Sequence, residues 1–309
     1  MTNDPTPTAQ IQRRYGIVGR QAELAAALAA LGAGRDLLLE GPAGVGKSTL
    51  ALAACGHLGR ELVRVDGGDA GDGPDGGAVR DGDDVRDDGA ASFVAGPLAH
   101  AMRDGRLLFV TRLDLLPETL QSALATALEE RLVRLSGLGE VRAAAGFAVV
   151  ATCDPGDPRG AGPLESALVE RFARVTLGYQ SAADEAAIAA ADSGSDDVSL
   201  IGVAVRVTRG TRLHPGFVRG ASVRGASDMV TITEDLWAEN RDACGAVNRE
   251  TLRRAAEAAL APLVELSPDT DLASALDDLL ELVCGRGQDP DVVLAGGLAA
   301  ISEYPRTLD

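Results

Sequence analysis

Residues 37–49 read Leu-Leu-Leu-Glu-Gly-Pro-Ala-Gly-Val-Gly-Lys-Ser-Thr, a short apolar run followed by a glycine-rich loop. Four residues separate Gly41 from Gly46-Lys47-Ser48, which is the spacing of a phosphate-binding P-loop. The apolar run predicts a strand before the loop, and residues 48–57 predict a helix after it. Glycines let backbone N–H groups turn toward phosphate oxygens, and the positive end of the helix points at the same place. The sequence therefore predicts an ATP site formed by Gly41, Pro42, Ala43, Gly44, Val45, Gly46, Lys47, Ser48 and Thr49.

Two side chains of this loop have separate predicted roles. Lys47 would reach the β- and γ-phosphates of ATP, and the hydroxyl of Ser48 would hold Mg²⁺. Lys47 is also the single lysine of the chain. A chain that keeps its one lysine inside a phosphate loop indicates that the loop is used.

The composition limits the classes of partner. The chain has 309 residues, 46% of them hydrophobic, which predicts one large domain and one smaller domain. Its net charge of -17 disfavours nucleic acid and acidic membrane surfaces as partners. No apolar run is long enough to cross a bilayer, and residues 1–14 contain no apolar signal core. The four cysteines have neither zinc nor redox spacing and are typical of a reducing compartment, so we expect a cytoplasmic protein.

The order of the predicted elements describes an α/β domain followed by a helical domain. Strand, glycine loop, helix and second strand form a βαβ unit, which predicts a parallel sheet flanked by helices. From about residue 181 onward the pattern predicts helices alone. Strands are expected at residues 37–39, 62–65, 107–110, 147–152 and 175–177, a β-hairpin at 132–141, and helices at 20–31, 48–57, 97–103 and 117–130.

Domain boundaries follow from this order and from one change in composition. Residues 67–90 are mostly glycine and aspartate and predict a mobile acidic loop. We therefore expect a flexible N-terminal segment (1–14), an α/β nucleotide-binding domain (15–180), a smaller all-helical lid domain (181–285) and a C-terminal tail (286–309).

The opening segment and the order of elements resemble the MoxR family of AAA+ ATPases, which is related to the magnesium-chelatase ATPase subunit. Residues 17–20, Ile-Val-Gly-Arg, are similar to the family's opening segment. The resemblance implies that Val18 and Gly19 line the adenine pocket. It also implies a P-loop AAA+ sheet, followed by a helical lid, that uses ATP and Mg²⁺.

Two later segments extend the resemblance to arginines. Residues 165–172 resemble the arginine-finger segment of the family, in which Arg171 would reach the ATP of a neighbouring subunit. Residues 214–226 resemble the segment that carries the second sensor arginine, which would be Arg224. The resemblance thus implies a homo-oligomer, expected to be a hexameric ring, with ATP bound between subunits.

The polar positions that follow the third and fourth strands depart from the family pattern. The pattern has Asp and Glu after the third strand, where this chain has Thr111 and Arg112. The first sensor position, an Asn in the family, is Asp154 here. Arg112 is always cationic and cannot act as a base, whereas Thr111 would still touch a metal-bound water. The positions after the third strand form the Walker B motif of the family, and the first sensor position is its sensor 1. Their changed residues predict weak Mg²⁺ dependence and slowed hydrolysis.

Two interpretations of these departures stay open. In the first, Arg112 and Asp154 lie at neighbouring strand ends, about 5 to 8 Å apart, and form an ion pair. In the second, the alignment is shifted and Asp114 or Glu118 takes over the acidic role.

The resemblance implies a chaperone-like protein that remodels or matures a partner, often one with a von Willebrand factor A domain. Three hypotheses follow: an ATPase motor with weakened hydrolysis, a nucleotide-binding scaffold or pseudo-ATPase without significant turnover, and a DNA-handling AAA+ protein. Lys47, Arg171 and Arg224 favour retained ATP binding and assembly, whereas the acidic composition disfavours DNA.

Overall fold

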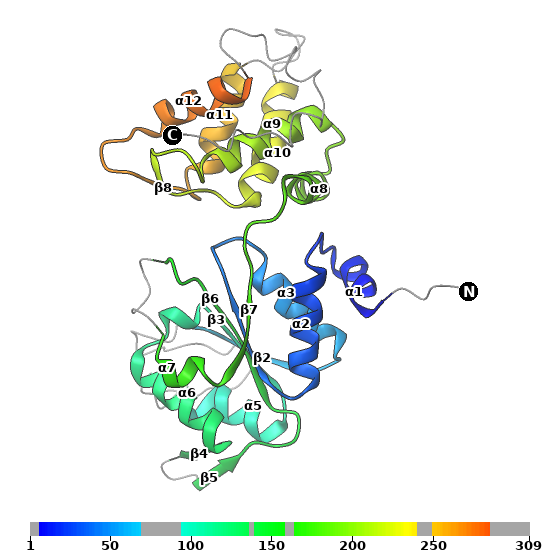
Figure 1. Cartoon of the computed structure of the whole chain (residues 1–309), viewed down its shortest axis with the longest axis vertical. Coiled ribbons are helices and arrows are strands. Elements are labelled where there is room, and N and C mark those ends of the chain that lie inside the picture. Colours follow the sequence, from blue (N-terminus) through cyan, green and yellow to red (C-terminus); the bar gives the residue numbers. More distant parts are fainter. Residues whose placement is uncertain (1–5, 69–93, 136–138, 158–163, 240–248, 285–309) are drawn as a thin grey trace, which may run out of the picture. The chain divides into compact units, whose positions relative to one another are not determined.

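The computed structural model describes residues 6–68, 94–135, 139–157, 164–239 and 249–284. It divides into two compact units, Met1–Gly178 and Tyr179–Asp309, which are described one at a time (Figure 1). The expected acidic loop lies outside the described residues from residue 69 onward, and so do the C-terminal tail and Cys244.

A five-stranded parallel sheet forms the centre of the first unit. Its strand order is β2-β3-β6-β1-β7, and every neighbouring pair is parallel. The third and fourth expected strands are neighbours, as predicted, because β3 pairs with β6. The last strand begins at Phe172 rather than at residue 175. The strands are β1 (Asp36–Glu40), β2 (Leu62–Asp66), β3 (Leu107–Thr111), β6 (Ala148–Cys153) and β7 (Phe172–Thr176).

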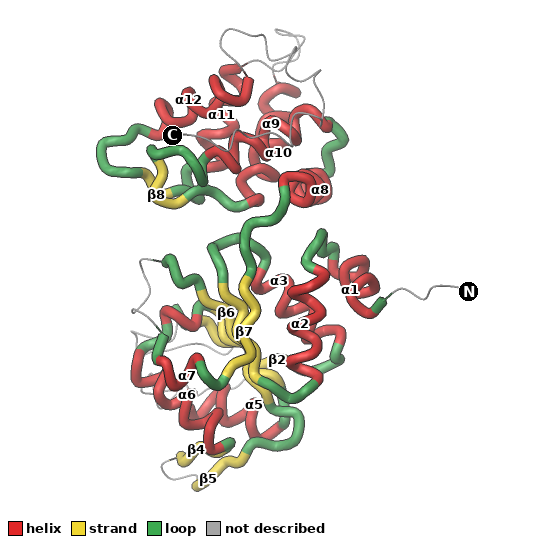
Figure 2. The backbone as a smooth tube through the Cα atoms, viewed as in Figure 1, coloured by secondary structure: helices red, strands yellow, loops and turns green. Residues whose placement is uncertain are grey.

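Helices cover both faces of this sheet, which therefore has an apolar core on each side (Figure 2). Successive side chains of a strand point to opposite faces, and all five residues of β1 are buried. Leu37 and Leu39 pack in the core beneath α1, α2 and α3, whereas Leu38 packs in the core beneath α5 and α6. The helical elements are α1 (Pro7–Tyr15), α2 (Gln21–Gly32), α3 (Lys47–His57), the π-helix η1 (Val94–Leu98), α5 (Ala99–Asp104), the 3-10 turn η2 (Leu113–Leu115), α6 (Glu118–Glu130) and α7 (Ser166–Val169).

Two local details differ from expectation. The segment expected to be flexible is helical from Pro7, because Thr6 caps the helix and Ile11 is buried among α2 and α3 residues. Pro117 is the N-cap of α6 rather than its first residue, since its ψ of 145° is not helical. The expected hairpin is present as β4 (Leu132–Leu135) and β5 (Gly139–Arg142).

The second unit packs its helices around a separate apolar core. One short antiparallel pair, β8 with β9, corrects the expectation of helices alone. This pair forms because residues on either side of α10 and α11 meet, which a pattern of helical periods does not reveal. Among the described helices, none combines the length and apolar character that crossing a bilayer requires. The elements are α8 (Ala182–Ser193), α9 (Val198–Gly210), β8 (Phe217–Arg219), α10 (Val223–Glu239), α11 (Arg249–Leu260), β9 (Glu265–Leu266) and α12 (Leu272–Cys284).

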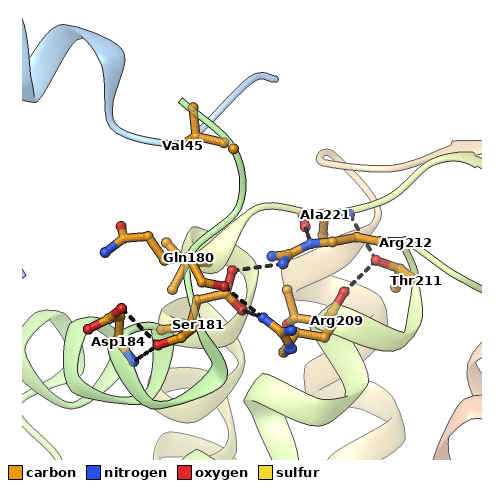
Figure 3. Close-up of polar contacts among 12 residues, drawn as sticks. Val45, Gln180, Ser181, Asp184, Arg209, Thr211, Arg212 and Ala221 are labelled. Carbon is orange, nitrogen blue, oxygen red and sulfur yellow. Dashed lines mark hydrogen bonds and ion pairs between the residues drawn. The ribbon is translucent and has the colours of Figure 1, made fainter. Parts of the chain in front are cut away.

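A buried ion-pair network fixes the chain between α9 and α10 (Figure 3). Glu185 of α8 is 2% exposed and accepts from Arg209 at 3.0 Å and from Arg212 at 2.7 Å. Arg212 also donates to the carbonyl of Ala221 at 2.7 Å and stacks on the ring of Tyr179. Two cations therefore share one buried carboxylate, and the segment that leads into α10 is held against α8.

We expect Glu185→Gln to lower the stability of the second unit by about 2 kcal/mol. The amide cannot balance two guanidinium groups, and a buried charge that loses its partner is costly. Urea unfolding followed by circular dichroism measures the change. Glu257→Gln is the matched control, because Glu257 makes an exposed pair with Arg253 on α11. Equal losses in the two variants would show that the buried network adds nothing.

Candidate nucleotide-binding site

The predicted phosphate loop joins β1 to α3 and has the backbone of an anion cradle. Gly41, Gly44 and Gly46 have φ values of 151°, 75° and 93°, which other residues rarely adopt. A Cβ atom on Gly41 would collide with the carbonyl oxygen of Leu177, so this position requires glycine for space as well. A Cβ atom on Gly46 would meet nothing, which leaves open space beside the first turn of α3.

Lys47 lies across this loop. Its Nζ atom donates to the carbonyl oxygens of Gly41 at 2.6 Å and Pro42 at 2.8 Å. Burial lowers the pKa of Lys47, and the negative charges of Asp154 and Asp114 act against that shift. The ammonium group is thus held at the mouth of the cradle, and acidic groups lie near it. Ser48 and Thr49 are exposed on the first turn of α3, where their hydroxyls are accessible to a phosphate-bound metal.

The segment expected to line the adenine pocket is tied to the loop by Arg20. Arg20 has a φ of 64° and directly follows Val18 and Gly19. Its guanidinium donates to the carbonyls of Val45 at 3.0 Å and Gly178 at 2.6 Å. The structure therefore brings the opening segment and the phosphate loop together. Sequence reasoning missed this role of Arg20, because its partners lie far away in the chain.

Arg112 follows β3 and turns away from the fourth strand. Its φ of 52° places it in the left-handed region, and its N–H donates to Thr152 at 3.3 Å. Its guanidinium forms an ion pair with Asp66 at the end of β2, with Nε at 2.8 Å from Oδ1. The expected ion pair between Arg112 and Asp154 was therefore wrong, because the partner of Arg112 in this ion pair is Asp66. Because β3 lies between β2 and β6, a side chain at its end can turn to either neighbour, and this one turns to β2.

Asp154 instead meets a second aspartate. The backbone N–H of Asp154 donates to Oδ1 of Asp114 at 3.2 Å. The side chain of Asp154 accepts from Gly156 at 3.1 Å within its own turn. Thr111 is half-buried, and its hydroxyl donates to the carbonyl oxygen of Val65 at 3.5 Å. The edge of the sheet near Lys47 thus carries Asp114 and Asp154.

The expected finger and sensor arginines lie on other elements. Arg171 follows α7 and forms an ion pair with Glu129 at 2.8 Å, with 37% of its side chain exposed. Arg224 belongs to the second unit and is exposed on the first turn of α10.

The comparisons with known proteins agree with this geometry. Residues 36–172 match the family model described as AAA domain (dynein-related subfamily). Protein NorQ of Paracoccus denitrificans (strain Pd 1222) is 26% identical over 254 residues, which are 81% of this chain and 86% of NorQ. The uncharacterized protein YojN of Bacillus subtilis (strain 168) is 29% identical over 176 residues, which are 55% of this chain and 58% of YojN. Midasin of Dictyostelium discoideum is 33% identical over 127 residues, which are 2% of midasin.

Solved structures share the fold. The Thermotoga maritima RuvB Holliday junction branch migration motor superposes with a TM-score of 0.52 at 20% identity, over 78% of this chain and 70% of that chain. A variant of the same RuvB gives a TM-score of 0.54 at 19% identity over the same shares.

The parallel sheet, the glycine loop and these likenesses show a P-loop AAA+ fold, which implies the use of a nucleotide and Mg²⁺. The similarities to NorQ and YojN, together with the matched domain, support a MoxR-like AAA+ ATPase.

Proposed function

We propose that this chain is a cytoplasmic MoxR-type ATPase subunit that binds ATP with Mg²⁺, assembles into a ring and remodels a partner protein. The observation that carries the proposal is the cradle between β1 and α3, with Lys47 at its mouth. Gly41 to Thr49 would hold the phosphates, Ser48 would hold the metal ion, and Val18 and Gly19 would contact the adenine. A partner with a von Willebrand factor A domain is the class that the MoxR resemblance favours.

In the same proposal, hydrolysis is slow because no acidic pair follows β3. Thr111 offers a neutral hydroxyl, and Arg112 is a cation engaged with Asp66. Phosphoryl transfer to water needs a metal to neutralise charge and a group to orient the water. Magnesium would then be held chiefly by the phosphates and Ser48, so ATP binding should depend weakly on Mg²⁺.

A second candidate function is a nucleotide-binding scaffold without significant turnover. Arg112 favours it, because the residue at the end of β3 is a cation that is paired with Asp66 and cannot accept a proton from water. A DNA-handling role has less support, since the net charge is -17 and the likeness to RuvB concerns the fold alone.

Assembly provides the test of this proposal. We expect ATP to promote oligomers of the wild-type chain, because Arg171 would contact the nucleotide of a neighbour and ligand binding at an interface stabilises it. Light scattering with and without ATP measures the change in mass. Arg171→Ala should remove the ATP response, whereas Arg142→Ala, which removes an exposed arginine of the hairpin, should keep it. A monomer at every nucleotide and protein concentration would contradict the ring.

A further inference from the structure

Asp114, one of the two alternatives for the acidic role in the shifted alignment, is a buried carboxylate at the carboxyl edge of the sheet. It lies on the 3-10 turn η2, which begins directly after Arg112. Arg112 adopts a φ of 52°, and the turn closes with Leu115 donating to Arg112 at 2.9 Å. The flanking Leu113 and Leu116 are fully buried, so the turn is anchored on both sides and fixes the place of Asp114.

One oxygen of this carboxylate is engaged and the other is not. Oδ1 accepts from the N–H of Asp154 at 3.2 Å, which fastens η2 to the end of β6. Oδ2 is fully buried and has no hydrogen-bond partner among the described residues, although Asp114 is only 5% exposed. An unpartnered buried carboxylate oxygen is costly, and such groups are retained where they have a use.

Backbone hydrogen bonds place Asp114 close to the start of the phosphate loop. The N–H of Gly41 donates to the carbonyl of Cys153 at 3.3 Å, and the N–H of the next residue, Asp154, donates to Asp114. Its negative charge is near enough to act on Lys47, as are those of Asp154 and Asp157. Burial raises the pKa of Asp114, and the neighbouring charges of Asp154 and Asp157 add to this rise. A carboxylate with a raised pKa accepts a proton more readily than a carboxylate with an ordinary pKa.

Three other carboxylates near the end of β3 are placed differently. Glu118 lies exposed in the first turn of α6. Asp66 is bound by Arg112 at the end of β2. Asp154 uses a side-chain oxygen within its own turn. Of these four carboxylates, only Asp114 is both buried and near Lys47. It also has an oxygen without a hydrogen-bond partner in the described part of the chain.

We propose that Asp114 is the catalytic carboxylate of this site, and that it orients and deprotonates the water that attacks the γ-phosphate. The inference rests on the proposed ATP-binding function. The water oxygen forms a bond to the γ-phosphorus, and the bond from that phosphorus to the β–γ bridging oxygen breaks. ADP leaves with the bridging oxygen, and the proton of the water passes to Oδ2 of Asp114 and then to the phosphate that has been released. Asp114 thereby supplies the turnover that Thr111 and Arg112 do not.

Asp114→Asn tests the assignment in the full-length protein. Asparagine keeps an oxygen that accepts from Asp154 and loses the ability to take a proton. We expect the single-turnover rate of ATP hydrolysis to fall about 100-fold, while the affinity for ATP stays within about twofold. The melting temperature should stay at or above that of the wild type, because the ionised carboxylate is disfavoured in the folded state. Glu118→Gln is the matched control and should keep the wild-type rate.

The outcomes separate this inference from the proposed function. Wild-type protein that does not bind ATP would contradict the proposed function itself. Binding without hydrolysis above a Lys47→Ala background, or equal rates for wild type and Asp114→Asn, would overturn the role of Asp114. A loss of rate that comes with a melting temperature lower by more than about 5 °C would mark Asp114 as structural and would equally overturn its catalytic role.

Discussion

Lys47→Ala is expected to weaken ATP binding by at least about 100-fold. The only lysine in the sequence donates to the carbonyls of Gly41 and Pro42 and therefore lies across the mouth of the phosphate loop. With ATP bound, the same ammonium group would exchange those carbonyls for phosphate oxygens, which carry far more negative charge. Alanine removes this cation, and the sequence contains no second lysine to replace it.

Isothermal titration calorimetry with ATP and with ADP measures the loss. Arg134→Ala is a matched control, because it removes a cation of the β4–β5 hairpin whose side chain is 64% exposed. The control should bind ATP as the wild type does. Equal ATP affinity in wild type and Lys47→Ala would show that the glycine loop is not the phosphate site.

The second large effect is a gain of function. Thr111→Asp combined with Arg112→Glu restores the acidic pair after β3 and should increase steady-state hydrolysis about 100-fold when Asp66→Asn is added. Without the third change, the new glutamate would lie beside Asp66, the present partner of Arg112, and like charges would repel. The compensating substitution therefore lies at the end of β2.

Phosphate release measured across a series of Mg²⁺ concentrations checks this prediction. The restored variant should also need Mg²⁺ more strongly, since a carboxylate again holds the metal. Asp66→Asn alone is the control, because it removes the ion pair between Asp66 and Arg112 without adding an acid and should not raise the rate. A rate that stays at the wild-type level in the triple variant would mean that another part of the site limits turnover.

The charge distribution of the site follows from two aspartates and one redirected arginine. The formal charges of Thr111, Arg112 and Asp154 sum to a more positive value than those of the Asp, Glu and Asn of the family pattern. With Arg112 directed to Asp66, and Asp114 buried next to Asp154, the part of the edge near Lys47 is acidic. We therefore expect a small residual turnover from this arrangement.

Much of the fold could be predicted from sequence, because its signals are local. The glycine spacing from Gly41 to Lys47 fixes a loop between strand and helix, and alternating or continuous apolar runs fix the strands. The order of these elements indicated a parallel sheet. The family resemblance implied that its third and fourth strands are neighbours, and the pairing of β3 with β6 confirms it. The resemblance of residues 17–20 and of the later segments indicated a MoxR-like AAA+ protein, which the matches to NorQ and the AAA domain support.

The arrangement of charged side chains was decided only by the tertiary structure. Arg112 pairs with Asp66, which lies 46 positions earlier in the chain, and nothing in the local pattern chooses β2 over β6 as its neighbour. Glu185 is buried between two arginines of α9 and the segment after it, although the alanine-rich sequence of its own helix gives no sign of these partners. Asp114 becomes buried because the left-handed turn at Arg112 folds it under the end of β6. Spacing and periodicity determine which elements form, whereas the partner and burial of a charge depend on which strand ends and turns meet in space.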